Sequence, residues 1–334
     1  MNALNAGSHI PPMTKMLPSP LVLLALVSTA YSWSAPTHQA IATAAVEMLK
    51  DLPARRNVAA ILAGETPATA ATWLDHVREQ SREKFQFPDP LAQQESEQFN
   101  GKFPNNSDWH FVDYPVGSTA YAPRGKFSSR DDIVHALQKA VRVLEGTSFG
   151  MSKRQALRVI FHLVADIHQP LHCSSGYYDL TDRNHPQLLA KVGDPKATPN
   201  DRGGNQLYYT KSQQLHALWD RGIPAHVAKE VDLVASVSGE RIDSFKSAGD
   251  YHAWPEIWAS ESMVEATEAY HGIILLSASD VPDPRHPDEV MLEIKIALPG
   301  GNKAYTVAQT VRAKKQLSRA SVHLAQLLSR IKYK

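Results

Sequence analysis

Two histidine–aspartate pairs are the residues of this chain whose types and spacing could perform chemistry. His162 and Asp166 are four residues apart, as are His216 and Asp220, and His172 follows the first pair. Residues at positions i and i+4 share one face of an α-helix, and imidazole nitrogen and carboxylate oxygen are both good zinc donors. The alternative is a helix-surface ion pair, which contributes only a few tenths of a kcal/mol. Two such pairs favour a metal site.

The surroundings of the first pair strengthen this interpretation. Its neighbours are apolar, namely Phe161, Leu163, Val164 and Ile167. A buried His–Asp pair without a ligand would carry a desolvation penalty. Pro170 should end the helix near His168 and turn the chain, which could bring His172 to a second metal ion. His168 does not share the face of His162, so we expect a supporting or structural role for it.

The elements that must position these residues are mostly helical. Apolar periodicity predicts helices over residues 37–49, 67–78, 131–144, 153–167, 213–219, 254–278 and 306–331. Thr37 is the expected N-cap of the first helix, and the second starts after Thr66 with a proline at its first position. The strand signals are a short run at 206–210 and a hairpin of 290–296 with 303–307 about the turn at 299–301. Residues 80–109, 176–204 and 280–288 are expected to form loops.

The candidate ligands run from residue 33 to residue 220, so that whole region should be one structural unit. We therefore expect a mainly α fold, a single-domain multi-helix bundle with long loop insertions and one small β-hairpin. The chain has 334 residues with 35 basic and 34 acidic side chains, a net charge of +1. With this balance the protein has no large overall positive charge that could attract nucleic acid. A polyanion would therefore have to be held by local charge or by metal ions.

The N-terminal segment has the pattern of a signal peptide over residues 1–32. Lys15 precedes the apolar run 21–27, and small residues at 30 and 32 predict cleavage before Trp33. A buried N-terminal helix is the alternative. We expect a secreted or periplasmic protein of bacterial type whose domain covers residues 33–334. Cys173 is the only cysteine, so no intramolecular disulfide can form; it is expected to be a small buried hydrophobic residue rather than a catalytic thiol.

Several short motifs together resemble a known family. They are Trp33 with His38, Thr72-Trp-Leu-Asp75 with Arg78, Trp109-His-Phe-Val-Asp113, Phe161-His162 through His172, Gly203-Gly-Asn205, and Leu215-His216-Ala-Leu-Trp-Asp220. Residue type, order and spacing agree with the single-strand-specific zinc nucleases of the S-one/P-one type. That family shares its fold with bacterial zinc-dependent phospholipase C. The resemblance covers residues 33–220, whereas the rest of the chain resembles the family only in being mostly helical.

The resemblance implies three zinc ions per chain. The first would be held by Asp75, His110, His162 and Asp166. The second would be held by His172, His216 and Asp220. The third would be held by Trp33, through its free α-amino nitrogen and carbonyl oxygen, with His38 and a bridging Asp166. Such a terminal-amine ligand would exist only after removal of the leader. Residues 80–109, which look like an insertion, separate His110 from Asp75.

The resemblance also implies hydrolysis of phosphodiester bonds in single-stranded DNA and RNA to 5′-phosphate products, with possible action on 3′-nucleotides. The catalytic residues would be Asp75, Arg78 and Asp166. Phe111 would stack on a base and Asp113 would bind the base edge. Two alternatives stay open from the residues alone: a surface ion pair for Asp75 with Arg78, and a core position for Phe111.

Two other function classes compete with the nuclease. One is a zinc-dependent phospholipase C that uses the same three metals, against which the pocket of Phe111 and Asp113 argues. The other is a secreted metal-binding protein without catalysis. We expect a monomer with no stable membrane association, whose substrates are single-stranded nucleic acids and nucleotides.

Overall fold

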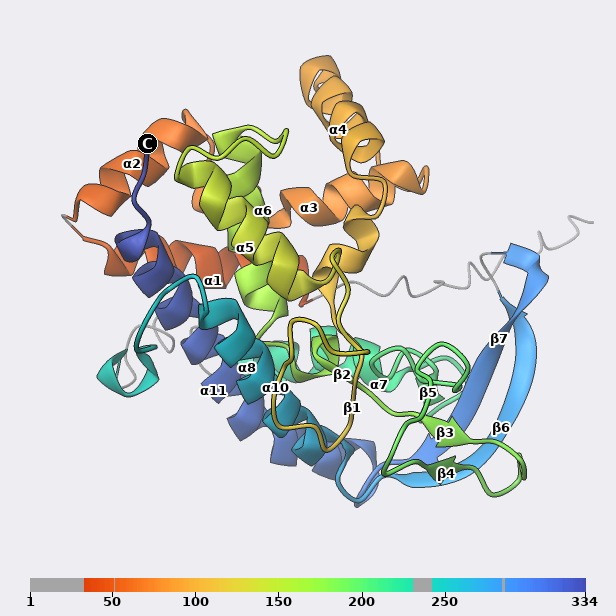
Figure 1. Ribbon diagram of the computed structural model, residues 1–334. Coiled ribbons are helices and arrows are strands. Elements are labelled where there is room, and N and C mark those ends of the chain that lie inside the picture. Colours follow the sequence, from red (N-terminus) through yellow and green to blue (C-terminus); the bar gives the residue numbers. More distant parts are fainter. Residues whose placement is uncertain (1–32, 51, 231–241, 284–285) are drawn as a thin grey trace, which may run out of the picture.

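The computed structural model describes residues 33–50, 52–230, 242–283 and 286–334, so the expected signal peptide lies outside the described residues. The fold is mainly helical, as predicted, with small sheets at one end (Figure 1). The longer helices are α1 (Ala35–Met48), α2 (Pro53–Leu62), α3 (Pro67–Ser81), α4 (Pro90–Lys102), α5 (Ile133–Leu144), α6 (Lys153–Asp166), α8 (Ile223–Glu230), α10 (Trp254–Tyr270) and α11 (Gly301–Arg330). Within these described ranges, no helix is long and apolar enough to cross a lipid bilayer.

Helix α6 is the central element of the core. A capping box starts it: the Ser152 hydroxyl accepts from the Gln155 N–H, and the Gln155 side chain accepts from the Ser152 N–H. Every residue from Ala156 to Asp166 is buried, and the helix packs against α1, α3 and α5. The predicted His–Asp pair therefore lies in the protein interior.

The helices that surround α6 begin at local sequence signals. The Thr66 hydroxyl caps α3 by accepting from the Thr69 N–H, and Asp132 caps α5 by accepting from the His135 N–H. The expected N-cap at Thr37 is wrong, because α1 already begins at Ala35 and Thr37 lies in its first turn. Proline at the second position suits that early start, since its fixed φ is helical and it needs no N–H partner there.

The described residues form three small sheets. Strands β1 (Tyr114–Pro115) and β2 (Ser174–Ser175) pair in parallel, and β3 (Tyr178–Asp179) and β4 (Gln187–Leu188) pair antiparallel. The third sheet has the order β5 (Leu207–Tyr208), β7 (His286–Ala297) and β6 (Ile274–Asp283). The long β6–β7 hairpin projects from the helical body, as does α4 (Figure 1).

The predicted hairpin is right in one strand and wrong in its partner. Residues 290–296 lie in β7, but they pair with β6 rather than with residues 303–307, which belong to α11. The expected turn exists, because Gly300 and Gly301 both have positive φ, yet it leads into a helix. The loop expected at 280–288 is instead occupied largely by the two strands of this hairpin, as far as the structure describes it.

Two other predicted boundaries need correction. The helix expected over 254–278 ends at Tyr270, and β6 follows from Ile274. Gly272, with φ +73°, is a left-handed residue at which a helix commonly stops. The loop expected over 80–109 contains α4, which starts where Asp89 accepts from the Leu91 N–H and a proline occupies the first position.

Candidate metal centre

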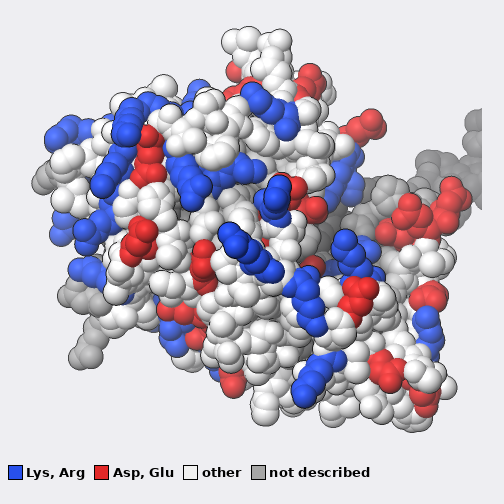
Figure 2. Space-filling view, in the orientation of Figure 1, with Lys and Arg blue, Asp and Glu red and all other residues white. Residues whose placement is uncertain are grey.

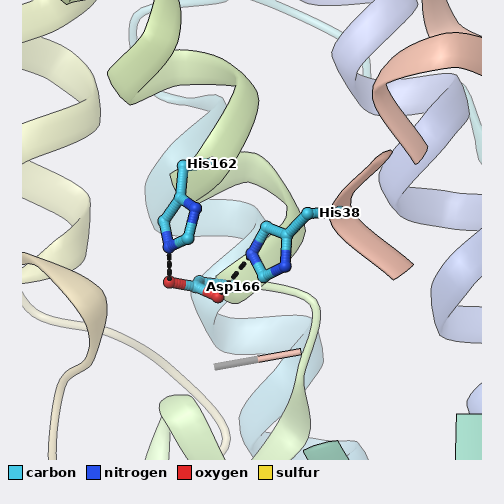
Figure 3. A group of neighbouring side chains, drawn as sticks. All are labelled: His38, His162 and Asp166. Atoms are coloured by element: carbon cyan, nitrogen blue, oxygen red, sulfur yellow. Dashed lines mark hydrogen bonds and ion pairs between the residues drawn. The ribbon is translucent and has the colours of Figure 1, made fainter. Parts of the chain in front are cut away.

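The centre is built around Asp166, at the C-terminal end of α6. Its Oδ1 lies 3.1 Å from His38 Nε2, and its Oδ2 lies 3.1 Å from His162 Nε2. Figure 3 shows the two imidazoles pointing toward opposite oxygens of this one carboxylate. A third imidazole, from His110, places its Nδ1 2.9 Å from Oδ2. All four side chains are buried, so the alternative of a surface His–Asp pair is wrong.

Ser34, which follows Trp33, is hydrogen-bonded to residues of this centre. The Trp33 side chain is fully buried, and the Ser34 N–H donates to the Asp220 backbone carbonyl at 2.9 Å. His38 Nδ1 lies 3.4 Å from the Ser34 carbonyl oxygen. Ser34 and the first turn of α1 are therefore bonded to residues of both predicted His–Asp pairs.

Helix α3 contributes Asp75 and Arg78 from its buried face. The Arg78 Nη2 donates to Asp75 Oδ1 at 2.6 Å, and His162 Nε2 lies 3.7 Å from the same oxygen. The i, i+3 ion pair left open by the sequence is thus present, but it is buried rather than on the surface. Burial raises the pKa of Asp75, yet Arg78 and the neighbouring imidazoles lower it overall, so the carboxylate is ionised.

His110 and His172 are held together by backbone pairing. The Val112 N–H donates to the His172 carbonyl at 2.8 Å, next to the parallel β1–β2 bridge, and His172 Nδ1 lies 2.7 Å from the His110 carbonyl oxygen. As predicted, Pro170 follows the end of α6, and a 3-10 helix (Pro170–His172) turns the chain. Burial lowers the pKa of His110 to about 3, so its imidazole is neutral and has a lone pair to donate.

The second pair forms a separate group. His216 lies in the short α7 (Leu215–Ala217), and Asp220 lies in the π-helical turn Leu218–Gly222 that follows it, rather than in one regular helix. His216 Nε2 is 3.2 Å from Asp220 Oδ2, and His172 Nε2 is 3.7 Å from Asp220 Oδ1. The Gln169 amide also donates to Asp220 Oδ1 at 2.8 Å. Gln169 was not among the residues predicted for the site, although it lies in the same run as Asp166 and His172.

Ligand atoms converge in three groups of buried residues. The atoms of each group lie within 4.8 Å of one another; the groups are Asp75, His110 and His162; His38, His162 and Asp166; and His172, His216 and Asp220. The group of His172, His216 and Asp220 has the same members as one expected ligand set. The group of Asp75, His110 and His162 lacks the expected Asp166, and the group of His38 and Asp166 contains His162, which was not expected there. Asp166 also lies next to the first set through His110 and His162.

The donor chemistry fits bound cations. Among the described residues, the buried His110 Nε2 and His172 Nε2 have no hydrogen-bond partner, which is costly for a polar atom removed from water. Burial disfavours protonation of His162, but Asp166 and Asp75 raise its pKa overall, and the surrounding imidazoles hold the pKa of Asp166 well below its usual range. The centre is thus a place where positive charge is favoured.

Backbone carbonyls orient most of the imidazoles. His162 Nδ1 lies 2.7 Å from the Ala71 carbonyl oxygen, and His216 Nδ1 lies 2.6 Å from the Gly203 carbonyl oxygen. Each Nδ1 can donate its proton to that carbonyl, which leaves the Nε2 lone pair directed at the carboxylates. His172 and His38 have the same arrangement, with Nδ1 toward a carbonyl, whereas His110 turns its Nδ1 toward Asp166. Such hydrogen bonds are typical around metal-binding histidines.

The Gly203 turn gives a direct stability prediction. A Cβ at Gly203 would lie 2.2 Å from the Leu171 carbonyl oxygen, and its φ of +62° is left-handed. We expect Gly203→Ala to lower the free energy of unfolding by about 2 kcal/mol or more, from the left-handed conformation and the clash. It should also weaken metal binding at His216. Urea unfolding and zinc titration measure both. Gly193→Ala, where a Cβ meets nothing within 4 Å, is the control; equal stability of the two variants would contradict this.

The remaining predicted residues lie at the edge of the centre or outside it. Phe111 is 38% exposed, so the core alternative is wrong. Asp113 is partly buried, and its Oδ1 accepts from the Ser175 hydroxyl at 2.5 Å. Cys173 is fully buried and burial raises its pKa, which agrees with a small hydrophobic role. His168 Nε2 lies 2.7 Å from His323 Nδ1, away from the ligand groups, in agreement with the expected structural role.

A mainly helical protein with three adjoining groups of buried His and Asp side chains is, by its fold and site, a candidate multinuclear metalloprotein. Sequence comparison identifies the class further. The family model described as "S1/P1 Nuclease" matches residues 33–332, and the chain belongs to this family. Membership supports a nuclease, and hence a hydrolase.

Two curated relatives agree with this assignment. The chain is 22% identical over 272 residues to "Nuclease S1" of Aspergillus oryzae (strain ATCC 42149 / RIB 40), covering 77% of this chain and 80% of the relative. It is 28% identical over 138 residues to "Endonuclease 2" of Arabidopsis thaliana, covering 36% of this chain and 39% of the relative.

Proposed function

We propose that the protein is a zinc-dependent endonuclease that hydrolyses single-stranded DNA and RNA to 5′-phosphate products and also acts on 3′-nucleotides. The observation that carries this proposal is the convergence of eight buried side chains into three candidate ligand groups in a chain of the nuclease family. Their residues are His38, Asp75, His110, His162, Asp166, His172, His216 and Asp220. The backbone of Trp33 is proposed as the ninth ligand.

Zinc is the metal that the donor set favours. Imidazole nitrogens and carboxylate oxygens suit Zn²⁺, whereas Mg²⁺ prefers oxygen ligands and keeps several of its waters. Bound zinc would supply Lewis-acid polarisation of the phosphoryl group and activation of the attacking water. The proposed ligand sets are Asp75, His110, His162 and Asp166; His172, His216 and Asp220; and Trp33, His38 and Asp166.

Arg78 is proposed to stabilise charge on the phosphoryl oxygens. Its Nη2 donates to Asp75, but its buried Nε has no hydrogen-bond partner among the residues that the structure describes. A guanidinium has five N–H donors in a fixed fork, so Arg78 can bind Asp75 and a phosphate oxygen together. Asp75 holds this side chain beside the candidate ligands.

Phe111 and Asp113 are proposed to bind one base of the substrate. The exposed Phe111 ring can stack on a base at a gain of about 1–3 kcal/mol. A base in a duplex is stacked on its neighbours, so it must leave the helix to reach this ring. This requirement is the physical source of the proposed preference for single strands.

Surface charge alone does not explain binding of a polyanion. Figure 2 shows Lys and Arg side chains interspersed with Asp and Glu side chains over one face, and the net charge of the chain is +1. The proposed zinc ions and Arg78 would therefore supply the local positive charge. We further propose that the protein acts as a monomer outside the cytoplasm, after removal of residues 1–32.

Removal of zinc tests this function. We expect exhaustive chelation to lower the rate of cleavage of single-stranded DNA to below about 1% of its starting value, because the catalytic charge is lost. Zn²⁺ should restore the rate and Mg²⁺ should not. Full activity in metal-free protein would refute the proposal.

The alternative functions are tested with the same zinc-loaded protein. Cleavage of phosphatidylcholine in vesicles, and not of nucleic acid, would indicate a phospholipase C. Zinc binding without any turnover would indicate a non-catalytic protein.

A further inference from the structure

Ser175 occupies a buried position between two parts of the proposed site. It lies in β2, and its side chain is fully buried. Its Oγ accepts from the Gly203 N–H at 2.7 Å and lies 2.5 Å from Asp113 Oδ1. An ionised carboxylate can only accept hydrogen bonds. The Ser175 hydroxyl must therefore donate to Asp113 while it accepts from Gly203, so its direction is fixed.

The partner on the other side of Ser175 orients a candidate ligand. The Gly203 carbonyl oxygen lies 2.6 Å from His216 Nδ1, so Gly203 is hydrogen-bonded to Ser175 through its N–H and to His216 through its carbonyl. A continuous chain of hydrogen bonds thus joins Asp113 to His216. Its members are separated widely in sequence and meet only in the folded protein.

A buried carboxylate anchors the turn that carries Gly203. Asp201 is fully buried, and its Oδ1 accepts from the Gly204 N–H at 2.9 Å and the Gly176 N–H at 3.1 Å. Its Oδ2 accepts from the Tyr178 hydroxyl at 2.7 Å. These bonds do not involve the Ser175 hydroxyl. The turn should therefore keep its position, and His216 its orientation, when that hydroxyl is removed.

The Asp113 carboxylate has one oxygen engaged and one available. Oδ1 is bound to Ser175, whereas no hydrogen bond to Oδ2 is found within the described part of the chain. The Tyr177 hydroxyl donates to the Asp113 backbone carbonyl at 2.9 Å, which fixes the backbone from which this side chain projects. Ser175 therefore selects the rotation of the carboxylate and leaves Oδ2 as the acceptor for an N–H group.

We propose that Ser175 is a positioning residue for base selection: it holds Asp113 so that Oδ2 accepts from the N–H edge of a base. This inference rests on the proposed function and deepens it, because it adds a residue that acts through Asp113 and touches neither metal nor substrate. Guanine suits a single available oxygen best, because its adjacent N1–H and N2–H groups can both point to Oδ2, whereas adenine and cytosine present an acceptor nitrogen beside their N–H group. The hydrogen bond from the Gly203 N–H to the Ser175 hydroxyl fixes the position of Ser175 relative to the Gly203 turn. It thereby also fixes the position of the base contact relative to the metal centre.

The test compares two single-stranded DNA substrates that differ only in one guanine or an abasic residue beside the cleaved bond. For Ser175→Ala, we expect KM to rise about tenfold on the guanine substrate, as expected for a weakened bond to a charged group. KM on the abasic substrate should change less than about twofold, and kcat and zinc content should stay near wild type. Ser175→Cys, which keeps a weaker donor, should give an intermediate KM.

Two further variants test whether the KM change arises through Asp113 and is particular to Ser175. In an Asp113→Ala background, Ser175→Ala should change KM by less than about twofold, because coupled residues are not additive. Ser174→Ala is the matched control: this neighbouring hydroxyl is equally buried and has no hydrogen-bond partner among the described residues. It should leave the guanine preference intact.

The outcomes distinguish a failure of the proposed role of Ser175 from a failure of the proposed nuclease function. Equal KM changes on both substrates, additive effects of Ser175 and Asp113, or the same loss in Ser174→Ala would overturn the role of Ser175. Those results would leave cleavage and zinc binding by the wild-type protein untouched. A wild-type protein that bound zinc but cleaved neither DNA would instead overturn the proposed nuclease, and the inference with it.

Discussion

Replacing Asp166 with asparagine is expected to lower kcat on single-stranded DNA more than about 1000-fold, because several catalytic contributions of about 10²–10³-fold each are lost together. The Asp166 carboxylate lies within 3.1 Å of three imidazoles, those of His38, His110 and His162. The amide nitrogen of asparagine is not a metal ligand, so it leaves one oxygen donor where the proposed site uses two. It also removes the negative charge that offsets the cations.

Zinc content gives an independent readout of the same variant. Asp166→Asn should hold fewer zinc ions than the wild-type protein by elemental analysis, whereas its circular dichroism should still show a helical fold when zinc is in excess. Asp280→Asn is the control, since Asp280 is half-exposed and forms an ion pair with the surface residue Arg183. Wild-type zinc content and kcat in Asp166→Asn would show that Asp166 is not a shared ligand.

An extra residue in front of Trp33 is expected to lower zinc content by one ion per chain and kcat about 100-fold or more, as for the loss of one strong charge-stabilising contact. An extension converts the terminal amine into an amide, which is a poor ligand. The packing leaves little room for adjustment: Trp33 is fully buried, and the Ser34 N–H is bonded to the Asp220 carbonyl.

A removable extension makes this second experiment decisive. A protein that carries a protease site ending directly before Trp33 can be assayed before and after cleavage, with zinc measured in both states. Cleavage should restore both the third zinc ion and the rate. The same extension placed after Lys334 serves as the control. Identical zinc content before and after cleavage would exclude the Trp33 amine as a ligand.

Local sequence rules were sufficient for features within one element. The four-residue spacing of His162 and Asp166, inside an apolar helical segment, determines that both point the same way, because helical periodicity is a local property. The cap at Thr66 and the turn after Pro170 follow from local sterics in the same manner. The helix stop at Gly272 was also present in the sequence, although the predicted helix ran on to residue 278.

Pairing between distant segments was decided only by tertiary structure. The partner of 290–296 depends on which strand reaches it, and the turn at Gly300 and Gly301 is equally compatible with a strand or with α11. Strand pairing is a long-range choice with weak local specification. For that reason the expected hairpin had the right strand and the wrong partner.

The candidate centre shows the same division. By themselves, the residue types and spacings of the chain indicated the chemistry, that is, two His–Asp pairs with nearby histidines whose side chains can bind a metal ion. Only the fold decided that His38 and His110, 128 and 56 residues away from Asp166, meet its two oxygens. The carbonyls that orient the imidazoles, and the link from Asp113 through Ser175 to Gly203, likewise exist only after folding. Backbone carbonyls are present at every residue, so no sequence pattern marks the ones that packing places beside a ligand.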